Sequence, residues 1–270
     1  MRRVAKALVT IVLYHQMLFW GLLVFVGHML TRPFTFPWDP GRRVPHAVAS
    51  FFWGRAFFGT HPFWRVKVEG VENAGPGPYL VICNHQSLVD SLAMLMIGHR
   101  IKFISHIKVF TAPLLGSSMR ICGYIGVEPG NPFPAPRVAR EINDWWALGE
   151  SVCLYPEGTR SGDGEIQPFK AGGFRLAHGA KVSILPVAID GTHEALPKGA
   201  KTYVGSPFKR IRVHVLPPIP WDACGNDPRA LAHLTHDTIA TELDRMRGRA
   251  LTDSSSETLP TPPPKRVASA

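Results

Sequence analysis

The stretch VICNHQSLVDSLAMLMIG, residues 81–98, decides the fold because it joins an apolar run to a helical pattern. The run before Asn84 is uninterrupted by polar residues, as in strands that are covered on both faces of a sheet. Ser87 and Asp90 stand at the S-x-x-D spacing of a capping box, ahead of apolar residues with a helical period. The stretch therefore predicts a strand, a short polar loop and a helix at 87–97, which is the repeating unit of α/β proteins.

Similar β-rich runs alternate with helical stretches through the rest of residues 65–250. Many of these runs are continuously apolar, which indicates central strands buried on both faces. We expect strands at 64–70, 78–83, 101–105, 124–128, 151–158, 182–190, 201–205 and 210–219. We expect the other helices at 137–148, 172–178 and 227–247. Together these elements predict an α/β fold, with a single mixed-sheet domain flanked by helices.

A segment of different character, residues 1–64, precedes this domain. No charged residue lies between Ala7 and Leu30, and a helix of this length would be roughly 36 Å long, enough to cross a bilayer core. The run is too long for a cleaved signal peptide and lacks a small-residue cleavage site. A buried helix of a soluble protein stays open as an alternative, because His15 and His28 interrupt the run.

A second apolar and aromatic segment follows at 45–64. Basic residues flank the first segment on both sides, so the positive-inside rule gives no orientation, and the sequence leaves open whether residues 7–30 span or only enter the bilayer. We expect the two segments to form a membrane-anchoring helical hairpin. Its arginines would lie at the lipid headgroups and its Trp and Phe rings in the interface.

The composition favours an anionic partner. The chain has 30 Lys and Arg against 20 Asp and Glu, with a formal net charge of +10, which suits nucleic acid, anionic lipid or a phosphorylated substrate. The basic residues are scattered and form no recognition motif, which argues against nucleic acid. The four cysteines have neither C-x-x-C nor metal-ligand spacing, so no disulfide framework or zinc site is predicted. Residues 251–270, rich in Ser, Thr and Pro, are expected to form a disordered tail.

His85 and Asp90 lie five positions apart where the helix at 87–97 begins, and two interpretations of them stand. In the first, Asp90 only caps the helix and His85 is a loop residue. In the second, the carboxylate of Asp90 holds one imidazole nitrogen of His85 and leaves the other free to take a proton, as a general base does. The pair alone is weak evidence for catalysis.

A second polar segment, LYPEGTRSGDGEIQPFKAG at 154–172, follows another expected strand. Arg160 offers a planar guanidinium to a phosphate, Gly158 permits close approach of a backbone, and Lys170 adds a positive charge before a helix. A polar surface turn with a solvated arginine is the alternative. The residue types suit a phosphorylated ligand, so the segment is a candidate binding site.

Three stretches taken together resemble, in order, three sequence blocks of the glycerolipid acyltransferase family, which includes the 1-acylglycerol-3-phosphate acyltransferases. They are NHQSLVD at 84–90, YPEGTRS with PFKAG at 155–172, and ILPVAI at 184–189. The resemblance implies that His85 is the general base of a direct acyl transfer and that Asp90 orients it. It also implies an acceptor-binding site formed by Glu157, Gly158, Thr159, Arg160 and Lys170.

The resemblance further implies the reaction, the partners and the location. A fatty acyl group would pass from acyl-CoA or acyl carrier protein to the free hydroxyl of a lysophospholipid, with 1-acyl-sn-glycerol-3-phosphate as the expected acceptor and phosphatidic acid as the product. The thioester is an activated donor, so neither a cofactor nor a metal is expected. The donor is made in the cytosol, so the catalytic domain is expected on the cytoplasmic face of a membrane.

One departure from the family concerns the acceptor headgroup. The family commonly has a G-x-x-x-x-x-R block, and here Pro129 stands where the arginine should fall. Either Arg137 or Arg140 takes over the phosphate contact, or the acceptor is another lysolipid, such as lyso-ornithine lipid. A non-catalytic membrane protein that binds anionic lipid is the competing class, but it gives no reason for His85 and Glu157 to occur in these blocks.

Overall fold

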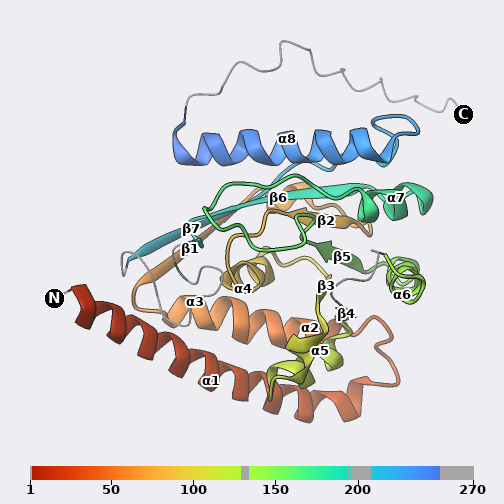
Figure 1. The fold of residues 1–270 in the computed structure, drawn as a ribbon. Helices are drawn as coiled ribbons and strands as arrows, with labels where there is room; N and C mark the ends of the chain where they lie inside the picture. Colours follow the sequence, from red (N-terminus) through yellow and green to blue (C-terminus); the bar gives the residue numbers. More distant parts are fainter. Residues whose placement is uncertain (1, 129–133, 194, 196–207, 250–270) are drawn as a thin grey trace, which may run out of the picture.

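The computed structural model describes residues 2–128, 134–193, 195 and 208–249. Within these residues a seven-stranded sheet has the order β1-β7-β6-β2-β5-β3-β4 (Figure 1). Neighbouring strands are parallel except for β6 and β7, which pair antiparallel, so the expected mixed-sheet α/β fold is confirmed. The strands are β1 Trp64–Glu69, β2 Leu80–Cys83, β3 Ile101–His106, β4 Ile125–Val127, β5 Ser151–Leu154, β6 Ile184–Asp190 and β7 Lys209–Val215.

Helices cover both faces of this sheet (Figure 1). α8, Pro228–Arg247, and α7, Gly172–Gly179, lie on one face, and α4, Val89–Met94, lies on the other. α6, Pro136–Ala147, lies against β4 and β5. The structure adds α5, Leu115–Cys122, which the sequence did not predict, and the strand expected at 201–205 lies outside the described residues. Short 3-10 turns occupy Val71–Asn73, Leu95–Ile97 and Ile107–Thr111.

The central strand β2 contributes to two hydrophobic cores. Val81 and Cys83 belong to the core that includes α4, whereas Leu80 and Ile82 belong to the core beneath α8. All four side chains are at most 1% exposed. A strand covered by helices on both faces has no side toward water, which accounts for its uninterrupted apolar sequence.

The N-terminal segment is a helical hairpin that shares a core with the α/β domain. Its first arm is α1, Arg2–Thr35. Its second arm consists of α2, Arg43–Ala49, a π-helical stretch, Ser50–Ala56, and α3, Phe57–Thr60. Buried side chains from both arms pack in the same core as Val81 of β2. The residues expected to form a disordered tail, 251–270, lie outside the described part of the chain.

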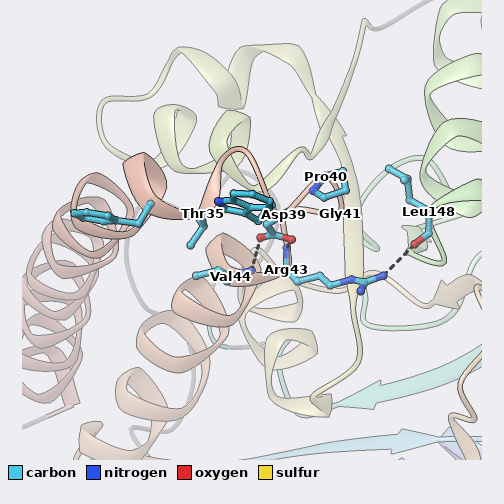
Figure 2. A pocket seen from close by; sticks show the side chains of 9 residues that line it. Thr35, Asp39, Pro40, Gly41, Arg43, Val44 and Leu148 are labelled. Atoms are coloured by element: carbon cyan, nitrogen blue, oxygen red, sulfur yellow. Dashed lines mark hydrogen bonds between the residues drawn. The ribbon is translucent and has the colours of Figure 1, made fainter.

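Buried charges fasten the turn of the hairpin to the sheet. The fully buried Lys102 of β3 donates through Nζ to the carbonyl oxygens of Gly41, at 2.6 Å, and Cys122, at 3.2 Å. The buried carboxylate of Glu150 accepts from Nε of Arg43 at 2.7 Å. Figure 2 shows Arg43 extending beside a pocket of about 390 Å³ at this turn and reaching the carbonyl of Leu148. These bonds fix the hairpin relative to the α/β domain.

Candidate active site

The site lies at the carboxyl ends of three adjacent strands. The loop with His85 follows β2, and the loop with Arg160 follows β5, which pairs parallel with β2. On the other side of β2, the amide side chain of Asn84 exchanges two 2.8 Å hydrogen bonds with the main chain of Ile189 in β6. In sheets of parallel strands, ligands bind at this edge because loops from neighbouring strands converge there.

His85 and Asp90 form a hydrogen-bonded pair. Nδ1 of His85 lies 2.8 Å from Oδ2 of Asp90, whose side chain is fully buried. A carboxylate at Nδ1 keeps the proton on that nitrogen and leaves Nε2 as the one that can accept a proton from a substrate. The imidazole is 18% exposed and lines a large cavity. The arrangement is that of a base with its orienting carboxylate.

The carboxylate of Asp90 also organises the start of α4. Its Oδ2 accepts from the main-chain N–H groups of Gln86, at 2.7 Å, and Ser87, at 2.8 Å. The bond from the N–H of Ser87 has the S-x-x-D spacing of the predicted capping box, although α4 begins at Val89 with Leu88 as its N-cap. One oxygen atom, Oδ2 of Asp90, therefore bonds both the main chain at the helix start and the imidazole of His85, as the two interpretations of the sequence required. The structure buries this carboxylate and places three N–H donors on Oδ2, whereas Oδ1 has no hydrogen-bond partner among the described residues.

Tyr155 stacks on His85, a contact that sequence reasoning missed. The ring centroids are 4.0 Å apart and the planes are inclined by 18°. The Tyr155 hydroxyl lies 3.1 Å from Oγ of Ser91, one helical position beyond Asp90. The imidazole is therefore held at its edge by a carboxylate and on its face by an aromatic ring. The only signal in the sequence was the aromatic residue at the head of the PEGTRS block.

Glu157 lies beneath the site rather than in the cavity lining. It is 5% exposed, and its Oε1 accepts from the main-chain N–H of His85 at 2.7 Å. Burial raises the pKa of Glu157 to about 7, although hydrogen bonds from main-chain N–H groups oppose that shift. The carbonyl of His85 accepts from the N–H of Ser161 at 2.8 Å. The peptide units on both sides of His85 are thus fixed by the loop that follows β5.

The remaining candidate binding residues line the same cavity as His85. The cavity has a volume of about 1020 Å³, and its lining includes Gly158, Thr159, Arg160 and Lys170. Gly158 has a φ of 73°, a left-handed backbone conformation that favours glycine, and it lies against the flexible end of the Lys170 side chain. The structure therefore brings four of the five residues assigned to the acceptor to the wall of one cavity.

Two further arginines contribute to the lining. Arg137 lines the cavity and donates to the carbonyl of Gly126 at 2.7 Å, and Arg175 lines it from α7. Arg140, the other candidate to replace the missing family arginine, is exposed and is not in this lining. Pro129 itself lies outside the described residues.

Apolar side chains form another part of the lining, and some of them come from the hairpin. Met17 of α1 and Trp53 of the π-helical stretch line the cavity, together with Leu88, Leu92 and Phe103. A ligand in this cavity would therefore meet cationic groups as well as an apolar wall. That combination suits an amphiphile with an anionic head.

Comparison with known proteins gives the class to which this fold and site belong. The sequence profile of the acyltransferase family matches residues 65–190, which include every candidate catalytic and binding residue. The crystal structure of the 1-acyl-sn-glycerophosphate acyltransferase PlsC from Thermotoga maritima superposes with a TM-score of 0.76 at 25% identity, over 93% of this chain and all of that one. Residues 65–190 of the chain, which form most of its α/β domain, therefore match the acyltransferase family.

Curated relatives add detail at the level of sequence. The chloroplastic 1-acyl-sn-glycerol-3-phosphate acyltransferase of Arabidopsis thaliana is 31% identical over 72% of this chain and 53% of its own length. The human 1-acyl-sn-glycerol-3-phosphate acyltransferase alpha is 30% identical over 70% of this chain and 63% of its own. The matched region thus spans little more than half of these relatives.

Proposed function

We propose that this protein transfers a fatty acyl group from acyl-CoA or acyl carrier protein to the free hydroxyl of 1-acyl-sn-glycerol-3-phosphate, giving phosphatidic acid. The observation that carries the proposal is the 2.8 Å pair of His85 and Asp90, which opens onto a cavity with both cationic and apolar walls. The names of the similar acyltransferases from Arabidopsis thaliana, Homo sapiens and Thermotoga maritima support the choice of acceptor.

The proposed reaction needs one general base. Nε2 of His85 takes the proton of the acceptor hydroxyl while that oxygen attacks the thioester carbonyl. The buried carboxylate of Asp90 stabilises the imidazolium that forms, and the stacked ring of Tyr155 holds the imidazole plane. The tetrahedral intermediate then collapses with loss of the thiolate, which recovers the proton from Nε2. The new ester bond replaces the thioester, so no redox partner is required.

The charges of the cavity support an anionic headgroup. Among the described residues, its lining has four cationic side chains of Arg or Lys and one carboxylate, Glu128. Arg160 and Lys170 lie in the loop that also holds the His85 peptide, so a phosphate bound there would lie near the base. We propose that Arg137 compensates for the arginine that the family commonly has at the position of Pro129.

The hairpin supports a membrane location. The segment Lys6–Thr35 of α1 is long and apolar enough to cross a membrane by length and composition, and only 22% of its most apolar window is buried in the protein. Its exposed side chains include Leu18, Phe19 and Leu22, each about half exposed or more. We propose that residues 1–64 form the membrane anchor, with the exposed face of α1 in the apolar phase and the catalytic domain on the cytoplasmic face.

One observation favours a second candidate acceptor, a lysolipid without the glycerol phosphate headgroup. Without an arginine at 129, the site lacks a phosphate ligand that the family commonly supplies, which favours an acceptor such as lyso-ornithine lipid. The test uses the purified full chain in detergent, with acyl-CoA or acyl carrier protein as donor and three acceptors: lysophosphatidic acid, lyso-ornithine lipid and lysophosphatidylcholine. Mass spectrometry follows the acylated products.

The proposal expects phosphatidic acid as the main product. Acylation of lyso-ornithine lipid with lysophosphatidic acid left unchanged would overturn the proposed acceptor and keep the acyl transfer. No product from any acceptor, with retained binding to anionic vesicles, would overturn the enzyme and favour a non-catalytic lipid-binding protein.

A further inference from the structure

The last turn of α8 reaches the loops of the active site through one side chain, Arg247. Its guanidinium donates from Nε to Oδ1 of Asp190 at 2.9 Å, and from its two terminal nitrogens to Oε2 of Glu165 at 3.0 Å and to the carbonyl oxygen of Gly164 at 2.7 Å. The side chain is 15% exposed. With all three nitrogens bonded, the planar group has little freedom to move.

The carbonyl of Gly164 connects Arg247 to the loop after β2, which carries His85. The same oxygen accepts from Nε2 of Gln86, at 3.1 Å, and Gln86 directly follows His85. The N–H of Gly164 donates to Oγ of Ser161 at 2.9 Å, and the N–H of Ser161 donates to the carbonyl of His85 at 2.8 Å. Two short hydrogen-bonded routes therefore run from Arg247 to the residues around the imidazole.

We propose that Arg247 is a positioning residue for the acyl transfer, holding the loop with Thr159 and Arg160 in register with His85. The inference rests on the proposed function. Arg247 is absent from the described lining of the cavity, and it follows the matched family region by more than fifty residues, so it acts through Gly164. The α8 helix would thus contribute to acceptor binding without contacting the acceptor.

Removal of this side chain should leave the fold intact. Asp190 keeps its 2.7 Å ion pair with Arg212, and Glu165 keeps the two bonds from Arg249. Neither carboxylate is left buried without a cation, which is the usual cause of a large loss of stability. The carbonyl of Gly164 loses its shorter bond and keeps only the one from Gln86. The local consequence is therefore a looser loop rather than an unfolded helix.

The test compares Arg247→Ala with Arg245→Ala in the full chain. Arg245 lies two residues earlier in α8, carries the same charge and pairs with Glu242, away from the loop. We expect Arg247→Ala to raise KM for lysophosphatidic acid by roughly tenfold or more, because small displacements of positioning groups are costly. Arg245→Ala should change KM by less than about twofold, since Arg245 is 61% exposed and the buried Glu242 keeps its 2.6 Å contact with His214. Arg247→Lys, which can replace one bond, should recover part of the effect.

A purely structural role predicts a different result. Partial unfolding would lower the melting temperature and the apparent kcat and leave KM unchanged, and that outcome would overturn the proposal. Hydrogen exchange supplies a second measurement that needs no substrate: the amides of 161–165 and 85–87 should exchange faster in Arg247→Ala than in wild type or Arg245→Ala. Unchanged exchange would also overturn the proposal.

Failure of the proposed function and failure of the proposed role of Arg247 give different results. If the wild-type chain acylates no lysolipid, the proposed function fails, and the exchange experiment still reports whether Arg247 holds the loop. If the wild type is active and Arg247→Ala has a normal KM, only the role of Arg247 fails.

Discussion

Replacement of Glu157 by glutamine tests the electrostatics beneath the active site. The carboxyl group is 5% exposed, and burial is the main cause that raises its pKa from 4.5 to about 7. Glutamine is neutral, has nearly the same shape and can still accept the 2.7 Å hydrogen bond from the N–H of His85. Glu157→Gln therefore mimics the protonated carboxyl at every pH.

The sign of the effect follows from proton linkage. Below about pH 4.5 the carboxyl of Glu157 is protonated in both the folded and the unfolded chain, so pH has no effect through this group. Between about pH 4.5 and 7 the unfolded chain releases the proton and the folded chain keeps it, so stability falls as pH rises. Above about pH 7 the stability contributed by the protonated carboxyl of Glu157 is fully lost. The difference in pKa corresponds to about 3 kcal/mol of stability.

The assay compares melting temperatures at pH 5 and pH 8. The advantage of Glu157→Gln over wild type should grow between these values by roughly 5–10 °C, since about 2.5 kcal/mol of the wild-type stability is lost between pH 5 and pH 8. Glu72→Gln makes the same change of charge at an exposed position and serves as the control. A constant difference between Glu157→Gln and wild type across this range would refute the account of a buried, protonated carboxyl.

Three other variants test the proposed catalytic pair, the proposed acceptor site and the proposed membrane anchor. Asp90→Asn should lower kcat by about 10³-fold to 10⁴-fold in steady-state assays, because a neutral amide neither fixes the tautomer of His85 nor stabilises its imidazolium form. A kcat near that of wild type would show that Asp90 has no part in the mechanism. Arg160→Ala should raise KM for lysophosphatidic acid by about tenfold to a hundredfold through loss of a charge-assisted hydrogen bond, and an unchanged KM would place the phosphate elsewhere. The double variant Leu18→Ser with Leu22→Ser should weaken vesicle binding by about 3 kcal/mol or more in flotation assays. The control Val71→Ser, at an exposed position of the α/β domain, should bind vesicles as the wild type does. If the double variant also binds as tightly as wild type, this face of α1 stays out of the bilayer.

The central strands were predictable because a strand that is buried on both faces has an uninterrupted apolar sequence. β2 and the part of β6 from Ile184 to Ile189 are continuously apolar, and the structure covers both of their faces. α5 was not predictable in the same way. Its sequence, LGSSMRIC, is short and contains glycine and two serines, which are poor helix formers. Gly116 permits close contact with the main chain of Phe110, a tertiary contact that sequence periodicity does not report.

The site was predictable in part for a related reason. His85 and Asp90, the proposed catalytic pair, lie within one short segment, and their spacing suits a helix start, so the 2.8 Å contact could be anticipated. The place of Glu157 could not, because its carboxyl turns inward to bind the main chain of His85, 72 residues away. The contact of Arg247 with Gly164, at a separation of 83 residues, depends likewise on how α8 lies over the sheet.

The most direct test of the central claim is the rate of phosphatidic acid formation by His85→Ala. The variant is purified in detergent beside His233→Ala, which removes an exposed imidazole from α8. With wild-type melting temperatures for both proteins, we expect His85→Ala to lose activity by about 10²-fold to 10⁴-fold, the usual contribution of a general base. His233→Ala should retain the wild-type rate. A folded His85→Ala protein that forms phosphatidic acid at the wild-type rate would contradict the assignment of His85 as the base.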